Sequence, residues 1–253
     1  WQIAAKHKLH VIEDNAQAIG AHGPGFRICD RSDAATTSFI IQKNLGTFGD
    51  SGAVVTNNPD IDARIRKLRN HGSDKRNVHS FGFNSRLDDL HAGILSAKLK
   101  HIDEWNDQRR KWAARYSAGL KDCRTIDLPV ELPGYRHVYH LYVIETKKPK
   151  WRDMLLDHLV KAGIDAKTHY SIAIHKQAGY PWGKNARIVG PLTNAEANAA
   201  CCISLPMYPE LLPQEVDYVI EKVREWDAKF AAEAPEGKGI AQRGKTCPSC
   251  SKA

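Results

Sequence analysis

A lysine and a carboxylate, each at the end of an apolar run, are the residues best suited to do chemistry. Lys43 follows the apolar residues 38–41 and lies in a glycine-punctuated loop, and Asp14 ends the run 9–14. We expect both runs to be buried strands, whose ends hold the ligand in α/β sheets. A lysine amine can form a Schiff base with pyridoxal phosphate, and a carboxylate can keep the ring nitrogen protonated. The pair therefore favours a pyridoxal-phosphate site, although most lysines are solvated surface charges.

Five blocks of sequence lie between about Leu9 and Glu225. They are residues 12–18 (IEDNAQA), 38–58 (SFIIQKNLGTFGDSGAVVTNN), 69–72 (RNHG), 82–109 (GFNSRLDDLHAGILSAKLKHIDEWNDQR) and 204–216 (SLPMYPELLPQEV). In their order and spacing, these blocks resemble the sugar aminotransferases of pyridoxal-phosphate fold type I. This DegT/StrS-type group aminates keto sugars carried on nucleotides.

The resemblance implies an α/β fold. Residues 1–104 would form the C-terminal part of the large cofactor-binding domain, with a mostly parallel sheet and flanking helices. Residues 105–232 would form a small α/β C-terminal domain, and residues 233–253 a flexible tail. The N-terminal part of the large domain, with its phosphate cradle and the aromatic residue stacked on the cofactor, is expected to be missing.

The resemblance also assigns cofactor-binding roles to five residues. Lys43 matches the Schiff-base lysine, which also moves a proton during transfer, and Asp14 matches the partner of the ring nitrogen. Gln17 matches the side chain against the ring, and Ser38 matches a hydroxyl that contacts the cofactor phosphate. Asn84 matches an asparagine that reaches the phosphate of a partner subunit, which implies a homodimer.

Other matching positions shape the sugar pocket of the family. They are His71, His169, Tyr170 and His175, while Arg86, near Asn84, would be an interface or substrate contact. Histidines and tyrosines at such positions also serve structural roles, so this alternative stays open. For Asn84 the alternative is that it caps, together with Ser85, a helix beginning at Leu87.

Some residues depart from the family pattern. Ile41 and Gln42 stand where many members have a proline before the lysine stretch, and Asn15 stands where many have alanine. Neither change removes a reactive group. We therefore expect the cofactor chemistry to be retained at Lys43 and Asp14.

The composition excludes several other classes of protein. No apolar run approaches the roughly 20 residues of a membrane-spanning helix. The net charge is +8, but no basic run with interleaved aromatic residues indicates nucleic-acid binding. The six scattered cysteines favour a reducing cytosol. The 12 histidines form no HExxH pattern and indicate no metal site.

The local patterns predict a series of helices and strands. Asn58 and Pro59 predict the start of a helix that ends by Gly72. A long helical pattern over 87–120 is expected to bridge the domains, with Asp103 and Asn106 as candidates for a bend within it. The remaining predictions are a strand over 138–145, a helix over 151–161, a strand over 164–170, a capping box at 193–196 and a last helix from Pro213.

Three functional hypotheses follow. The first is a pyridoxal-phosphate aminotransferase that moves an amino group from glutamate to a nucleotide-linked keto sugar, for surface polysaccharide or glycosylated metabolites. The second is a truncated, non-catalytic or regulatory relative without a complete cofactor pocket. The third is a nucleic-acid or zinc-binding module that uses the tail motif Cys247-Pro-Ser-Cys250.

Overall fold

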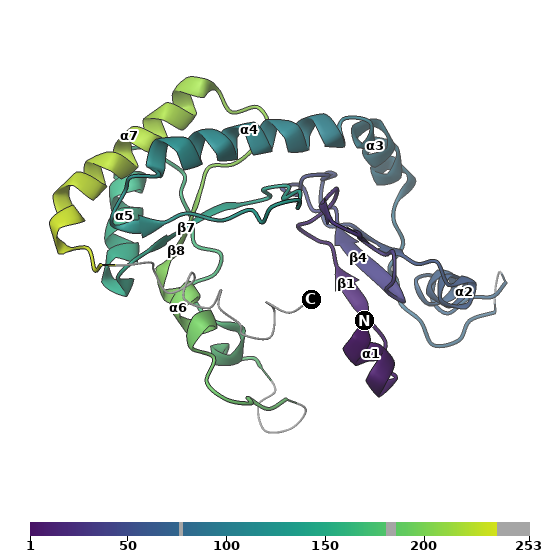
Figure 1. Cartoon of the computed structure of the whole chain (residues 1–253). Coiled ribbons are helices and arrows are strands. Elements are labelled where there is room, and N and C mark those ends of the chain that lie inside the picture. Colours follow the sequence, from purple (N-terminus) through teal and green to yellow (C-terminus); the bar gives the residue numbers. More distant parts are fainter. Residues whose placement is uncertain (76–77, 181–185, 237–253) are drawn as a thin grey trace. The chain divides into compact units, whose positions relative to one another are not determined.

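The computed structural model describes residues 1–75, 78–180 and 186–236, which divide into two compact units (Figure 1). The N-terminal unit contains residues 1–110 and 131–140, and the C-terminal unit contains residues 111–130 and those from 141 onward. The boundary falls within helix α4 (Ile102–Leu120), so each unit includes one part of this helix. The two cysteines of the predicted CPSC motif lie outside the described residues.

The N-terminal unit is built from short strands followed by helices. Its elements are α1 (Gln2–His7), β1 (Ile12–Asp14), β2 (His22–Gly23), β3 (Phe26–Arg27), β4 (Ala34–Ser38), β5 (Gly52–Val55), α2 (Pro59–Leu68), α3 (Asp89–Leu99) and the first part of α4.

A three-stranded sheet with the order β1-β4-β5 organises this unit (Figure 1). β1 runs parallel to β4, and Asp14 is the register partner of Thr36. β5 runs antiparallel to β4, and Gly52 is the register partner of Ser38. The predicted strand end over 38–41 is wrong for residues 39–41, because β4 ends at Ser38 and these residues belong to the following loop. A strand does form within the run 9–14, but its Ile12 is 70% exposed and not buried as predicted.

The loop between β4 and β5, residues 39–51, is closed by backbone contacts. The Thr47 N–H donates to the Phe39 carbonyl at 2.8 Å. Lys98 of α3 donates from its amine to the carbonyl of Gly46. A Cβ atom at Gly46 would lie 2.4 Å from the carbonyl oxygen of Ile41, so this position has no room for a side chain. The loop that carries Lys43 therefore has a restricted conformation.

The C-terminal unit is a small sheet covered by helices. Besides the second part of α4, its elements are β6 (Ile126–Asp127), β7 (Tyr142–Thr146), α5 (Pro149–Lys161), η1 (Ile174–Lys176), α6 (Thr193–Cys201), β8 (Cys202–Leu205), α7 (Pro213–Phe230) and η2 (Ala231–Glu233).

In the core of the C-terminal unit, α5 packs against the antiparallel sheet β6-β7-β8 and also against α7. α5 buries Trp151, Leu155 and Leu159. α7 begins at Pro213 and buries the residues that the sequence predicts along one face, namely Val216, Val219, Ile220, Val223 and Trp226. These side chains supply the hydrophobic burial that stabilises the unit.

The long helical pattern predicted over 87–120 is interrupted, but at Lys100 and His101 and not at the candidate bend residues Asp103 and Asn106. The chain forms α3 and α4, with a turn at Lys100 and His101 between them. No glycine or proline marks this turn, and apolar residues continue at helical spacing across it, so the sequence pattern conceals the break. The first helix begins at Asp89 with Asp88 as its N-cap residue, which contradicts the alternative that Asn84 and Ser85 cap it.

Two further local predictions are wrong. The segment 164–170 forms no strand, because only Lys167 pairs with a neighbouring chain segment, at Ser204. The predicted capping box at 193–196 does not form either. Thr193 is already the first residue of α6, and the Glu196 carboxylate instead binds His175 and Lys176.

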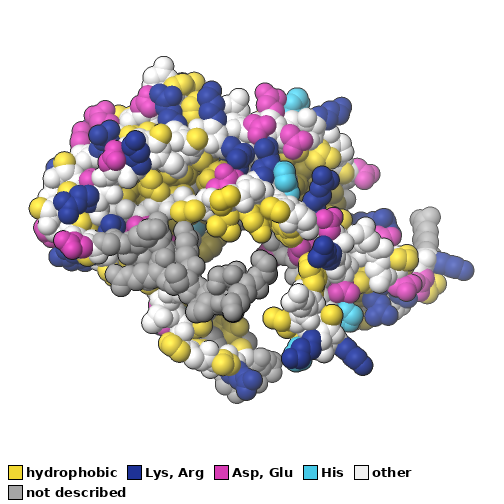
Figure 2. Space-filling model, in the orientation of Figure 1, with side chains coloured by type: hydrophobic (Ala, Val, Ile, Leu, Met, Phe, Trp, Pro, Cys, Tyr) yellow, Lys and Arg dark blue, Asp and Glu magenta, His cyan; other side chains and the backbone are white. Residues whose placement is uncertain are grey.

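The surface carries charges of both signs. On the face drawn in Figure 2, Lys and Arg side chains alternate with Asp and Glu side chains and do not gather into one basic patch. No helix within the described ranges is long and apolar enough to cross a membrane. The four cysteines in the described part of the chain, Cys29, Cys123, Cys201 and Cys202, are free thiols.

The buried face of α5 predicts a matched pair of mutational effects. Leu155→Ala should lower the free energy of unfolding by about 2–5 kcal/mol, because it removes a fully buried side chain and leaves a cavity. The adjacent Met154, which is 44% exposed, serves as the control, and Met154→Ala should cost less than about 1 kcal/mol. Urea unfolding of both variants measures the difference, and equal effects would contradict this packing.

The closed loop at Gly46 predicts a second pair of mutational effects on stability. Gly46→Ala should destabilise the chain by about 1–3 kcal/mol, since the new methyl group has no space beside two backbone carbonyls. Gly93→Ala, in α3 with no atom within 4 Å of the new Cβ, should instead raise stability by about 0.5–1 kcal/mol. Thermal unfolding of the two variants gives the comparison. A Gly46→Ala variant as stable as the parent chain would show that the loop is not closed in this way.

Candidate active site

The parallel pairing of β1 and β4 brings Asp14 and Ser38 to one edge of the N-terminal sheet. Asp14 ends β1, and Ser38 ends β4 two residues beyond the register partner of Asp14. Residues two apart on a strand share a face, so Asp14, Thr36 and Ser38 lie on the same face of the sheet. Ser38 lies roughly 7 Å farther along the strand direction than Asp14, at about 3.3 Å per residue.

Of the two neighbouring acids in β1, only Asp14 has a carboxylate that is available to bind a ligand. Glu13 points to the opposite face, and its carboxylate accepts hydrogen bonds from the Cys29 N–H at 2.6 Å and the Ser32 hydroxyl at 2.7 Å. The Asp14 side chain is exposed and accepts a hydrogen bond from the Ala16 N–H at 2.9 Å. Glu13 therefore stabilises the fold, while Asp14 can bind a ligand.

The segment after β1 turns sharply and carries Gln17. The Asp14 carboxylate bonds to the Ala16 N–H, and the Ala18 N–H donates to the Asn15 carbonyl at 3.1 Å. These bonds leave Gln17 exposed in the turn. The amide oxygen of Asn15 is buried and has no hydrogen-bond partner within the described residues. A buried acceptor without a partner is uncommon in native proteins and is consistent with a polar ligand that completes the site.

Lys43 lies in the first turn of the β4–β5 loop. Its N–H donates to the Ile40 carbonyl at 2.8 Å, which fixes the backbone five residues beyond Ser38. Its side chain is half-buried, and its amine makes no hydrogen bond or ion pair with any described residue. The Ser38 hydroxyl, also half-buried, accepts a long hydrogen bond of 3.4 Å from the Ile40 N–H. An amine without a competing partner is available to react.

These residues fit pyridoxal phosphate. The cofactor needs an amine for its aldehyde, a carboxylate for its ring nitrogen and hydrogen-bond donors for its phosphate. Lys43, Asp14 and Ser38 supply these three groups from two neighbouring strands and the loop that follows one of them. The unpaired Asn15 oxygen adds a polar atom at the same strand end. The chemistry of this set therefore matches the predicted cofactor.

His71, Asn84 and Arg86 lie together in the loop that follows α2. Asn84 forms a β-bridge with Asn70, and the His71 N–H donates to the Phe83 carbonyl at 2.9 Å. His71 adopts a left-handed backbone conformation with φ of 59°. All three side chains are exposed. The structure thus brings these predicted residues into one loop, and their roles stay predictions.

His169, Tyr170 and His175 belong to the C-terminal unit. All three line a cavity of about 560 Å³ whose walls are mostly apolar. The His169 ring nitrogen Nδ1 lies 2.8 Å from the Ser204 hydroxyl, and His175 Nε2 lies 2.9 Å from the Glu196 carboxylate. The structure therefore groups these three predicted residues around one cavity.

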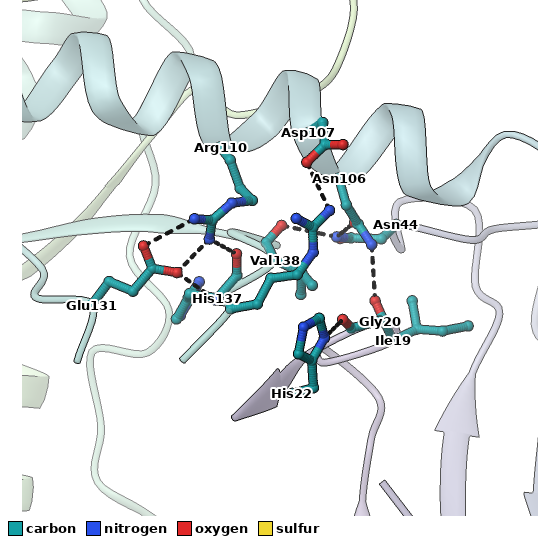
Figure 3. A network of polar contacts seen from close by, with 11 residues as sticks. Ile19, Gly20, His22, Asn44, Asn106, Asp107, Arg110, Glu131, His137 and Val138 are labelled. Carbon is teal, nitrogen blue, oxygen red and sulfur yellow. Dashed lines mark hydrogen bonds and ion pairs between the residues drawn. The ribbon is translucent and has the colours of Figure 1, made fainter. Parts of the chain in front are cut away.

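A network of polar contacts in the N-terminal unit was not predicted (Figure 3). Arg110 of α4 holds the segment 131–140 by binding the Glu131 carboxylate and by donating to the His137 carbonyl at 2.8 Å. Burial raises the pKa of Glu131, but hydrogen bonds from Arg110 and from the His137 N–H outweigh it and lower the pKa below its usual value. The same network includes Asn44, the residue after Lys43. An amide next to the candidate lysine was the only signal for it in the sequence.

Comparison with known proteins identifies the family. A model of the DegT/DnrJ/EryC1/StrS aminotransferase family matches residues 1–224. The chain is 43% identical over 226 residues to dTDP-3-amino-3,4,6-trideoxy-alpha-D-glucose transaminase of Streptomyces venezuelae, covering 89% of this chain and 58% of that protein.

Solved structures give the same result. The chain matches S. venezuelae DesV in complex with a ketimine intermediate with a TM-score of 0.82 and 43% identity, covering 89% of this chain and 60% of that chain. It matches NtdA of Bacillus subtilis with bound cofactor PMP with a TM-score of 0.78 and 30% identity, covering 90% of this chain and 52% of that chain.

These matches confirm the predicted resemblance and the predicted fold class, part of a fold type I aminotransferase. The chain spans about three fifths of the length of the Streptomyces relative, since it covers 58% of that protein. Because the family model matches residues 1–224 of 253, the chain belongs to the DegT/DnrJ/EryC1/StrS aminotransferase family.

Proposed function

We propose that this chain forms part of a pyridoxal-phosphate-dependent aminotransferase that transfers an amino group from glutamate to a nucleotide-linked keto sugar. The observation that carries the proposal is the parallel pairing of β1 with β4, because it puts the strand end at Asp14 on the same side of the sheet as the start of the loop that carries Lys43. Family membership supports the reaction class, and the bound PMP in the NtdA structure supports the cofactor. The names of the relatives support a nucleotide-linked sugar as substrate.

Each residue at the sheet edge has a defined role in this proposal. Lys43 would hold the cofactor covalently through Nζ, and its amine would move a proton to and from the carbon that reacts. Asp14 keeps the ring nitrogen protonated, because a nearby negative charge favours the charged form of a base. Gln17 packs against the ring, and Ser38 binds the phosphate. The cofactor itself supplies a ring that stabilises negative charge at the reacting carbon.

The remaining predicted residues act on the substrate side of the reaction. In the proposed homodimer, Asn84 binds the cofactor phosphate of the partner subunit. His71, Arg86, His169 and Tyr170 contact the sugar nucleotide. The free thiols of the described cysteines are consistent with action in the cytosol, where the product would enter polysaccharide or glycosylated metabolite synthesis.

Covalent trapping tests the proposal. The chain is incubated with pyridoxal phosphate and reduced with borohydride, and the labelled peptides are mapped by mass spectrometry. Among the lysines that the structure describes, Lys43 combines a half-buried amine without a partner with a place in the loop after β4, the strand that pairs with β1, so we expect the label to be confined to Lys43. Lys43→Ala should remove the label, whereas Lys100→Ala, which removes an exposed lysine at the end of α3, should leave it unchanged.

Two results would contradict the proposal. One is label scattered over many lysines, since this indicates random reaction of surface amines. The other is no label at all on a chain that unfolds cooperatively. The absence of label would favour the alternative hypothesis, a non-catalytic relative that lacks a complete cofactor pocket.

A further inference from the structure

Two buried asparagines connect the two loops that carry the candidate cofactor-binding residues (Figure 3). Asn44 follows Lys43 directly, and its amide nitrogen donates to the side-chain oxygen of Asn106 in α4 at 2.8 Å. The Asn106 amide nitrogen donates in turn to the carbonyl of Ile19 at 3.1 Å. Ile19 lies two residues beyond Gln17. One chain of hydrogen bonds therefore joins the Lys43 loop to the segment that follows Asp14.

The backbone carbonyls determine the orientation of both amides. Ile19 offers a carbonyl oxygen, so Asn106 must donate to it and present its own oxygen to Asn44. Asn44 must then donate to Asn106, and the same nitrogen also donates to the Val138 carbonyl at 3.1 Å. The Asn44 oxygen is left to accept from His140 Nδ1 at 3.1 Å, which assigns the proton to this nitrogen. Each amide thus has one orientation that satisfies its neighbours.

Burial makes this arrangement hard to replace. Asn106 is fully buried and Asn44 is 7% exposed, so water cannot substitute for a lost partner. The space around Asn106 is also filled. A Cβ atom at Gly20, which has φ of 86°, would lie 2.8 Å from the Asn106 amide nitrogen. The two loops are therefore held to α4 by hydrogen bonds between groups that are shielded from water.

We propose that Asn44 and Asn106 are positioning residues, which hold the Lys43 amine and the Asp14–Gln17 segment at a fixed separation so that both act on one cofactor. This proposal rests on the function proposed above. Neither asparagine contacts the cofactor in this account. Asn106 acts through Asn44 on the Lys43 loop and through Ile19 on the other loop, although these two loops are far apart in sequence.

Hydrogen exchange tests the connection without any cofactor. In Asn106→Ala, amide exchange should rise about tenfold in both segments 16–21 and 40–47, because one buried group restrains both. The matched control is Asn57→Ala in the same unit, since the Asn57 amide also donates to a backbone carbonyl, that of Cys29 at 3.0 Å. This control should leave both segments unchanged. If Asn106→Ala does not fold, Asn44→Asp tests the hydrogen bond between Asn44 and Asn106. It replaces the Asn44 amide nitrogen, which donates to Asn106, with an oxygen that accepts.

Cofactor labelling provides the second readout. With the parent chain labelled at Lys43, Asn106→Ala and Asn44→Ala should each slow labelling of Lys43 about tenfold, and the double variant should slow it no further, since both break one connection. Exchange that rises in only one segment, or Lys43 labelling at the parent rate, would overturn the positioning role. If the parent chain itself is not labelled, the proposed function fails, while the exchange experiment still decides whether the two loops are connected.

Discussion

The parallel pairing of β1 with β4 is the interaction on which the candidate site depends. It sets Asp14 opposite Thr36 and therefore places Asp14 and Ser38 on one face, at the edge where both strands end. A shift of the register by one residue would turn Asp14 to the other face and bring Glu13 in its place. The hydrogen bonds from Cys29 and Ser32 to Glu13 oppose such a shift, because they hold that carboxylate on its own side. The same contacts that stabilise the strand thus select which acid faces the ligand.

A second constraint acts on the loops rather than on the strands. Loops usually tolerate movement, yet the loop with Lys43 is fastened to α3 through Gly46 and to α4 through Asn44. Both contacts satisfy polar groups that would otherwise be buried without a partner, and such groups are costly to leave unpaired. These contacts with α3 and α4 therefore restrict the backbone around Lys43. A reactive amine held in this way needs little rearrangement to meet its cofactor.

Much of the fold could be predicted from the sequence, for reasons that particular residues make clear. Asn58 and Pro59 start α2 because the cap and the fixed proline φ are local properties, and the Asn58 side chain accepts from the N–H groups of Asp60 and Ile61. The buried face of α7 followed from its periodicity. The position of the break between α3 and α4 could not be predicted, since no glycine or proline marks it, and the candidate bend residues Asp103 and Asn106 lie inside α4. The segment 164–170 was wrongly predicted to be a strand, because Ile164 and Ala166 are buried as in a strand but have no paired strand beside them.

The candidate site also contains some residues that could be predicted from the sequence and others that could not. Lys43 and Asp14 could be predicted because a reactive group at the end of an apolar run can be recognised from the sequence alone. The partners of Asn44 could not, since they come from positions 106, 138 and 140, and only the folded chain shows that they meet. An asparagine within the helix that begins at Ile102 gave no indication of which carbonyl it would bind. Long-range polar contacts of this kind depend on tertiary structure alone.

The most direct test of the account is whether Lys43 and Asp14 act on the same cofactor molecule. The chain can be reduced onto pyridoxal phosphate labelled with ¹⁵N in the ring, and the ¹⁵N chemical shift followed by NMR as the pH rises. We expect the ring nitrogen to stay protonated to a higher pH than in the free reduced cofactor. Asp14→Asn should remove this difference, while Glu13→Gln, on the opposite face, should not. A ring nitrogen that titrates in the parent chain as it does in free solution would contradict the account.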